Sequence, residues 1–112
     1  DAEQNRNLLS VKKVLEYISI HYREPLSVKE LSGISNYSEF YFMKLFKQYT
    51  GKTAAAYLND YRLEKAKSLL LHTDNSVTDI AIEVGFNNTS YFIKKFQEAN
   101  QISPHKFRKK MS

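Results

Sequence analysis

The sequence predicts an all-α fold of about seven helices, in which two similar halves are joined by a long central helix. The chain of 112 residues contains only 3 glycines and 2 prolines, which argues against a turn-rich β architecture. Apolar residues recur at three- and four-residue spacing along most of it. The segments on either side of residues 53–72 also repeat one pattern of capping and apolar positions.

The central helix is predicted over residues 53–72, TAAAYLNDYRLEKAKSLLLH. This segment has no glycine or proline, is rich in Ala, Leu, Lys and Glu, and begins at Thr53, a residue type that caps helices. Its apolar residues lie on more than one face, as expected of a helix that packs on one body at its start and on another at its end. Its 20 residues would span about 30 Å.

The first half begins with a helix predicted over residues 7–22. Residues 1–7 are polar and are expected to be frayed, and the absence of an initiating Met indicates a fragment of a longer protein. A proline at position 25 follows the helix and disfavours helix at the residue before it. The helix is indicated by apolar residues at helical spacing, namely Leu8, Val11, Val14, Leu15, Ile18 and Tyr22.

A short helix and a longer one complete the first half. Residues 27–30 form a capping-box pattern, in which the serine hydroxyl and the glutamate carboxylate are each expected to accept from a backbone N–H. Residues 33–37 are predicted to form a tight turn. Ser38 is expected to cap the next helix, and Gly51 to end it. On this longer helix, the residues expected to face the core are Phe42, Leu45, Phe46 and Tyr49.

After a connector at residues 72–75, the second half repeats the pattern. A capped short helix is followed by a glycine turn, then by a capped helix with an aromatic anchor, and then by a last short helix that a serine and a proline open. In order, the residues that carry these features are Ser76 to Asp79, Gly85, Asn87 or Asn88, Phe92 and Phe96, and Ser103 with Pro104.

The two halves are copies at a nearly constant offset. The offset is 49 for Ser27 to Ser76 and for Leu31 to Ile80, and it is 50 for Ser38 to Asn88, Phe42 to Phe92 and Phe46 to Phe96. The single-residue change falls inside the turn, where an insertion costs least. Each copy is therefore a helix-turn-helix unit, whose second helix enters the DNA major groove where the unit binds DNA. The alternative is a helical hairpin repeat used only for packing.

These boundaries divide the chain into a first subdomain at residues 7–52, a linker helix at 53–72 and a second subdomain at 73–112, which we expect to form one DNA-binding domain together. The linker's length is close to one turn of DNA, about 34 Å. The formal net charge of +5 and the isoelectric point of about 9.4 favour a polyanionic partner, with a merely soluble basic surface as the alternative. The lack of a run of about 18 apolar residues and of a signal-peptide pattern predicts a soluble cytoplasmic protein without membrane contact.

An ordered set of motifs over residues 11–110 resembles the DNA-binding domain of the AraC/XylS family of bacterial transcription regulators. Two residues depart from that pattern: Ser32 stands in place of a small apolar residue, and Gln101 in place of the glycine that Gly51 supplies in the first copy. The resemblance implies seven helices and two units that present one helix each to successive major grooves. The motifs are Leu26-Ser27-Val28-x-x-Leu31, Phe42-x-x-x-Phe46-Lys47-x-x-x-Gly51, Tyr57-Leu58-x-x-x-Arg62-Leu63-x-x-Ala66-x-x-Leu69-Leu70, Ile80-Ala81-x-x-x-Gly85-Phe86, Tyr91-Phe92-x-x-x-Phe96 and Ser103-Pro104-x-x-Phe107-Arg108.

The same resemblance places base contacts on the outward faces of the two longer helices. Lys44 is the strongest candidate, since a lysine can donate to guanine O6 and N7. Phe40 and Met43 would either touch thymine methyl groups or complete the core. The equivalent face of the second copy carries Thr89, Ser90, Ile93 and Lys94. For the lysines among the further candidates the alternative is a solvated surface charge, and for Glu39 it is a favourable charge at the N-terminus of its helix. The further or phosphate-contacting candidates are Glu39, Lys47, Lys52, Asn88, Lys95, Gln97, Lys106 and Arg108.

Arg62 differs from these basic residues, because its apolar neighbours predict a structural role in an ion pair or in binding a carbonyl. The three histidines lie far apart and have no paired metal-ligand spacing, and the chain has no cysteine and no Gly-x-Ser-x-Gly motif. A phosphate-binding loop ending at Gly51 would need a glycine where Phe46 stands. We therefore expect no enzymatic activity and no cofactor.

The expected partner is double-stranded DNA, with RNA polymerase as a further candidate partner. An effector or dimerisation domain is expected outside this chain. The alternative function is a helical protein-interaction module that does not bind DNA.

Overall fold

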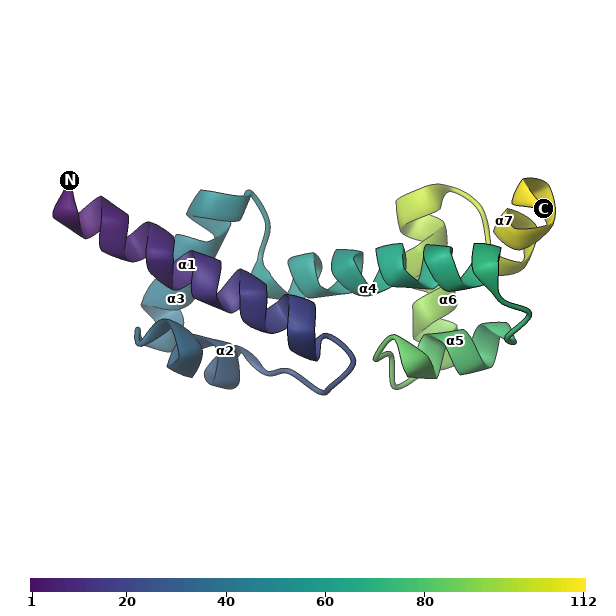
Figure 1. The fold of residues 1–112 in the computed structure, drawn as a ribbon, viewed down its shortest axis with the longest axis horizontal. Coiled ribbons are helices and arrows are strands. Elements are labelled where there is room, and N and C mark those ends of the chain that lie inside the picture. Colours follow the sequence, from purple (N-terminus) through teal and green to yellow (C-terminus); the bar gives the residue numbers. More distant parts are fainter. The chain divides into compact units, whose positions relative to one another are not determined.

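The computed structural model describes residues 1–112 and contains seven helices and no strand, which confirms the predicted fold class. The chain forms two compact units, Asp1–Leu58 and Asn59–Ser112, and the boundary between them lies inside the long fourth helix. None of the helices combines the length and the apolar character needed to cross a membrane. The helices are α1 (Ala2–His21), α2 (Val28–Ser35), α3 (Glu39–Thr50), α4 (Ala54–His72), α5 (Val77–Glu83), α6 (Thr89–Asn100) and α7 (Pro104–Met111) (Figure 1).

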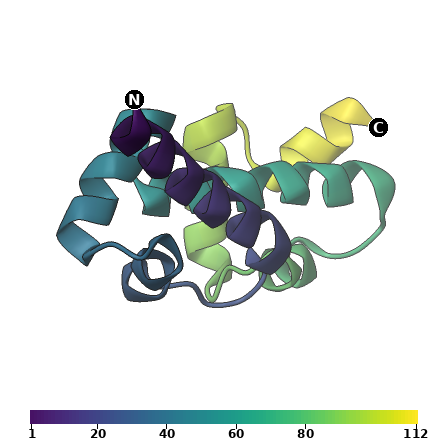
Figure 2. The same ribbon diagram turned by 60° about the vertical axis from the view of Figure 1, so that its left-hand side comes forward.

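In the first unit, α1 packs against both α2 and α3, and α2 packs against α3. Figure 2 shows α1, in purple, beside these two helices. The side chains of Val14, Ile18, Phe42 and Phe46 are fully buried between them. The phenylalanine rings of α3 lie 5.6 Å apart between centroids, so the aromatic anchor predicted for this helix is the centre of the first core.

The prediction of a frayed segment at residues 1–7 is wrong, because α1 begins at Ala2. Asp1 accepts a hydrogen bond from the Gln4 backbone N–H at 2.8 Å, and the Gln4 side chain in turn accepts from the backbone nitrogen of Asp1. This capping box satisfies the first orphan donors of the helix. A polar N-terminal segment was therefore a helix cap rather than a frayed end.

The capping box predicted at residues 27–30 forms only in part. Ser27 accepts from the Glu30 backbone N–H at 3.0 Å, as predicted. The Glu30 carboxylate accepts instead from the Tyr17 hydroxyl at 2.5 Å, which ties the start of α2 to α1. This hydrogen bond raises the pKa of Tyr17, because the charged phenolate would lose it.

The second unit repeats the arrangement, with α5 against α6 and α7 against the far part of α6. Ile80, Phe92 and Phe96 are fully buried in its core. Ser103 caps α7 by accepting from the Lys106 backbone N–H at 3.2 Å, and proline occupies the first turn, as predicted. Phe107 packs edge-on against Phe96, with ring centroids 5.5 Å apart, so α7 completes the second core.

Candidate nucleic-acid interface

The turn of the first unit differs from the prediction. Gly33 lies inside α2 rather than in the turn, and the left-handed residue is Asn36, with φ 66°. The Asn36 backbone N–H donates to the Gly33 carbonyl at 3.2 Å. The buried Ser35 hydroxyl donates to the Ser32 carbonyl at 2.6 Å and accepts from the Tyr37 N–H at 3.2 Å. Asparagine tolerates the left-handed conformation, so no glycine is needed here.

The serine that replaces a small apolar residue at position 32 is also accommodated within α2. Its hydroxyl donates to the Lys29 carbonyl at 2.9 Å, as expected for a serine bonding back to its own helix. The side chain is only 5% exposed, and this bond satisfies its hydroxyl. The departure from the family pattern therefore leaves no unpaired polar group in the first core.

The outward face of α3 carries the residues predicted to face bases. Ser38 caps the helix through the Tyr41 N–H at 3.2 Å, and Gly51 ends it with φ 80°. Phe40 is 81% exposed and Met43 is 52% exposed, so neither completes the core, and that alternative is wrong. Lys44 and the remaining candidates on this helix, Glu39 and Lys47, are also exposed.

These side chains border a groove in the first unit. Its volume is about 510 Å³. Apolar residues from three parts of the unit line it together with two lysines. The lining residues are Val28, Phe40, Met43, Lys44, Lys47, Gln48, Thr53, Ala54 and Ala55.

A polar cluster that no sequence motif predicts holds the start of α3. Asn7 on α1 is only 8% exposed. Its carbonyl oxygen accepts from the Tyr37 hydroxyl at 2.6 Å, and its amide donates to the Tyr41 hydroxyl at 3.2 Å. One asparagine thus binds both the turn and the first turn of α3. The available signal was a polar residue one helical turn before Val11, in line with the apolar stripe of α1.

The outward face of α6 is more polar. Asn88 caps the helix by accepting from the Tyr91 N–H at 2.9 Å, which decides between the two predicted asparagines. Ser90 and Lys94 are exposed, whereas Thr89 and Ile93 are half-buried. A shallow groove of about 430 Å³ lies along this face, lined by Ser90, Ile93, Lys94, Gln97 and Glu98.

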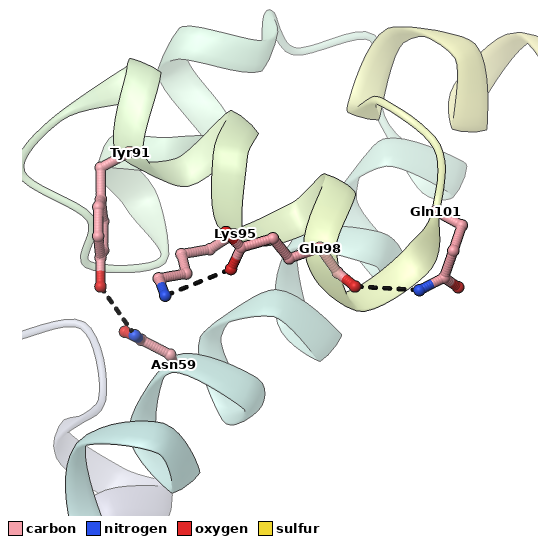
Figure 3. Close-up of polar contacts among 5 residues, drawn as sticks. All are labelled: Asn59, Tyr91, Lys95, Glu98 and Gln101. Carbon is pink, nitrogen blue, oxygen red and sulfur yellow. Dashed lines mark hydrogen bonds and ion pairs between the residues drawn. The ribbon is translucent and has the colours of Figure 1, made fainter.

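A second polar cluster joins α4 to α6 within the second unit (Figure 3). The Asn59 amide donates to the Tyr91 hydroxyl at 3.2 Å. Lys95 pairs with Glu98 at 3.4 Å, and its ammonium lies 5.5 Å from the centroid of the Tyr91 ring. Lys95 is therefore held by neighbours in its own helix, and its contact with phosphate stays a prediction.

The helix end at Gln101 has the left-handed conformation that glycine adopts more easily, with φ 59°. The backbone N–H of Gln101 donates to the Gln97 carbonyl at 2.8 Å, as Gly51 does to Lys47 in the first unit. Its side-chain amide donates to the Glu98 carbonyl at 3.0 Å (Figure 3). The second copy thus keeps the geometry of the first at a cost in backbone strain.

Arg108 binds the end of α4. Its guanidinium donates from Nε to the Leu70 carbonyl at 3.0 Å and from Nη2 to the Thr73 carbonyl at 3.1 Å. A cation suits this position, because the end of a helix carries unpaired carbonyls and partial negative charge. The structure gives Arg108 a structural role, and a phosphate contact by it stays a prediction.

Arg62 is buried, with 8% of its surface exposed, and its guanidinium lies 5.9 Å from the centroid of the Phe86 ring. Burial lowers the pKa of Arg62, because it penalises the charged form. This burial agrees with the structural role predicted for it. The two remaining candidates, Lys52 and Lys106, are exposed. Lys52 follows the end of α3, and Lys106 lies in the first turn of α7.

The fold and these faces define a protein with two helix-turn-helix units. A family model described as a helix-turn-helix domain matches residues 31–110. The regulatory protein PocR of Salmonella typhimurium is 37% identical over 102 residues, which cover 91% of this chain and 34% of that protein. The chain therefore spans about a third of that relative.

Solved structures are similar over nearly the whole chain. The C-terminal domain of the two-component response regulator yesN from Fusobacterium nucleatum is 35% identical, with a TM-score of 0.81 over 85% of this chain and 93% of that one. The DNA-binding domain of AdpA, solved in complex with a target DNA, is 25% identical, with a TM-score of 0.86 over 89% of this chain and 90% of that one. The chain belongs to the helix-turn-helix family of AraC-type domains.

Proposed function

We propose that this chain binds double-stranded DNA sequence-specifically, with α3 and α6 in successive major grooves, as the DNA-binding part of a transcription regulator. The observation that carries the proposal is that α3 and α6 each bury one side and expose a lysine on the other side. These lysines, Lys44 and Lys94, occupy the same repeat position. A helix used only for packing would not need this repeated exposed face. The DNA complex of the related AdpA domain supports the same use of the fold.

In this proposal Lys44 and Lys94 donate to base edges, guanine O6 and N7 being the acceptors in the major groove that suit a lysine. Thr89 and Ser90 lie in the first turn of α6, where a short hydroxyl can donate to or accept from a base edge. Glu39, in the first turn of α3, would accept from a cytosine amino group, or its negative charge would stabilise the positive N-terminal end of its own helix.

Phosphate contacts would come from exposed lysines and from backbone N–H groups at helix starts. Lys47, Lys52 and Lys106 are exposed and need no rearrangement of the core to reach a phosphate. Gln97 occupies the position of Lys47 in the second copy and would donate to a phosphate as a neutral group. The net charge of +5 favours the approach of such a surface to a polyanion.

The rest of the regulator would supply its input, since the chain spans only about a third of a curated relative. We propose an effector or dimerisation domain outside this chain and contact with RNA polymerase at the promoter. The proposed location is the cytoplasm of a bacterium, on the nucleoid, and the proposed role of the chain is binding without catalysis.

The test is a titration of the chain with mixed-sequence DNA at several salt concentrations, followed by selection of bound sequences from a random library. If about six phosphates are neutralised, the logarithm of the binding constant should fall against the logarithm of the salt concentration with a slope near −5. Selection should then enrich one sequence. No measurable binding would favour the interaction module, and binding without an enriched sequence would contradict sequence-specific recognition.

A further inference from the structure

Two tyrosine hydroxyls, one near the start of α3 and one near the start of α6, accept a hydrogen bond from the chain and donate none to it. Tyr41 and Tyr91 are each the third residue of their helix, and they stand 50 positions apart, an offset that relates the two copies. The side-chain amides of Asn7 and Asn59 donate to them, both at 3.2 Å (Figure 3 shows the second pair). A tyrosine hydroxyl is both donor and acceptor, so the proton of each is left for an acceptor outside the chain.

Two other tyrosines of the first unit use their hydroxyl protons within the chain. Tyr37 donates to the Asn7 side-chain oxygen at 2.6 Å, and Tyr49 donates to the Gln4 backbone carbonyl at 3.4 Å. Both bonds join α3, or the turn before it, to α1. Tyr41 lies between these two tyrosines in the sequence, yet its proton joins no helices.

The asparagines that hold the two hydroxyls come from different turns of their helices. The offset between α1 and α4 is 48, as from the buried Ile18 to the buried Ala66, and it matches Asn59 to Val11. Asn7 lies one helical turn before Val11. A contact inherited with the repeat would use the same donor position in both copies. Two different donors that hold a hydroxyl at one repeat position indicate that the hydroxyl itself has a use.

Each hydroxyl also lies beside an exposed lysine of its helix. Tyr41 precedes Lys44 by three residues and Tyr91 precedes Lys94 by three, a spacing that makes side chains neighbours on a helix surface. Tyr91 is 45% exposed, and the Lys95 ammonium lies 5.5 Å from the centroid of its ring. Accepting a bond from an amide polarises the O–H group and strengthens it as a donor. A phosphate oxygen is an acceptor that suits such a hydroxyl beside a cation.

We propose that the hydroxyls of Tyr41 and Tyr91 each donate a hydrogen bond to one phosphate of the DNA backbone, and that Asn7 and Asn59 are positioning residues that orient them. The inference rests on the DNA binding proposed above. It assigns two uncharged anchors, one for each unit, that hold the start of α3 and of α6 against the backbone at any base sequence. An uncharged donor neutralises no phosphate, so these anchors add affinity without releasing counterions.

The test replaces single phosphates of the selected DNA site by methylphosphonate, which is uncharged and lacks one of the free oxygens. The dissociation constant is measured for each position at one salt concentration. Tyr41→Phe and Tyr91→Phe should each bind the unmodified site about tenfold more weakly, the effect of losing one hydrogen bond to a charged acceptor. Each variant should also lose the methylphosphonate effect at one position, and the two positions should lie about 10 base pairs apart.

Three controls separate a phosphate contact from other causes. Tyr49→Phe removes a hydroxyl of α3 whose proton is already donated within the chain, so it should keep every methylphosphonate effect. The salt dependence of binding should be unchanged in Tyr41→Phe and Tyr91→Phe, because no charge is removed. Asn59→Ala should weaken binding in the wild-type chain and have no further effect in the Tyr91→Phe variant, since it acts through that hydroxyl. Circular dichroism should show that all variants are folded.

The outcomes distinguish this inference from the proposed function. A methylphosphonate effect that disappears in each tyrosine variant, with unchanged base preference on repeated selection, supports the inference. Full affinity in either variant, or methylphosphonate effects that either variant retains at every position, overturns it and leaves the proposed function standing. Weaker binding with an altered base preference also overturns it, because the hydroxyls would then orient the helices without binding phosphate. If the chain binds no DNA, both fail together.

Discussion

Substituting Gln101 by glycine should stabilise the chain, although it removes a hydrogen bond. The residue ends α6 with φ 59°, a conformation that costs a side-chain-bearing residue about 1–2 kcal/mol. Glycine would release that strain but would lose the bond to the Glu98 carbonyl, worth about 0.5 kcal/mol on an exposed surface. A further cost of about 0.5 kcal/mol comes from the greater freedom of the unfolded chain. The expected net gain is about 0.5 kcal/mol.

The first copy offers the reverse experiment. Gly51 ends α3 with φ 80°, and a Cβ added there would meet no atom within 4 Å, so Gly51→Gln would introduce strain without a clash. We expect it to destabilise the chain by about 1 kcal/mol, since reduced freedom of the unfolded chain offsets only part of the strain. Gln101→Ala separates the backbone strain from the side-chain hydrogen bond, because it keeps the strained backbone and removes only the hydrogen bond.

The assay is urea denaturation followed by circular dichroism. The slope of the unfolding free energy against urea concentration should be the same for all variants. For a chain of this size, a change of 1 kcal/mol moves the melting temperature by about 4 °C, so a parallel thermal scan resolves the larger effect. Gln101→Gly and Gln101→Ala should shift stability in opposite directions. Equal shifts for these two variants, or a harmless Gly51→Gln, would refute the argument from backbone strain.

Five further substitutions test other parts of the structure. Gly33→Ala should stabilise the chain by about 0.5–1 kcal/mol in urea denaturation, because Gly33 is helical and its missing Cβ would meet nothing within 4 Å; a loss of stability would contradict its place inside α2. Asn7→Leu should cost about 1–3 kcal/mol by leaving two tyrosine hydroxyls without their partner, and it should also weaken DNA binding; unchanged stability would show that water replaces the amide. Lys44→Ala and Lys94→Ala should each lower the binding free energy on the selected DNA site by about 1–3 kcal/mol and relax sequence preference in segments about 10 base pairs apart. Repeating the selection with each variant measures this, and changes at identical positions would contradict recognition of separate segments by the two units. Arg108→Ala should lower the melting temperature by about 4–8 °C, because about 1–2 kcal/mol of charge-assisted bonding to two carbonyls is lost; a purely phosphate-binding arginine would affect DNA affinity and not stability.

The helices and most of their caps followed from the sequence because their causes are local. Ser38, Ser76, Asn88 and Ser103 each accept from the backbone N–H three residues later, at the positions where a capping residue precedes an apolar stripe. The core phenylalanines followed from helical spacing for the same reason. These features depend on residues within one or two turns of each other.

The turn of the first unit shows that a glycine alone does not locate a turn. The sequence pattern predicts Gly33 in the turn, whereas the left-handed residue is Asn36. The repeat relates this residue to the second copy. Gly85, with φ 107°, stands 49 positions after Asn36, and the same offset relates Ser27 to Ser76. The repeat offset therefore predicts Asn36 as the left-handed residue of this turn.

Contacts between distant residues were beyond local patterns. Arg108 is a phosphate-contacting candidate in the sequence, yet it binds carbonyls 38 and 35 positions earlier. Asn7 likewise meets tyrosines 30 and 34 positions later. Polar side chains of this kind depend on which helix ends and hydroxyl groups the fold brings to them, so periodicity does not predict their partners.

The mixed apolar pattern of α4 has an explanation in the same repeat. The buried residues Ile18, in α1, and Tyr22, at its C-terminal cap, have counterparts 48 positions later in Ala66 and Leu70, which are also buried. That offset places Arg62 where the first unit has the buried Val14.

Arg62 is accordingly on the core-facing row of the second unit, and its burial over Phe86 follows from the repeat even though its hydropathy argues against it. The same offset places Asn59, which binds the Tyr91 hydroxyl, where the first unit has the buried Val11. The inner face of the second unit has therefore exchanged two apolar residues for polar ones that find ring and hydroxyl partners. In the hydropathy pattern this exchange is a break in the apolar stripe. An offset of 48, 49 or 50 between the two copies, chosen for each element, assigns each of these residues to its correct face.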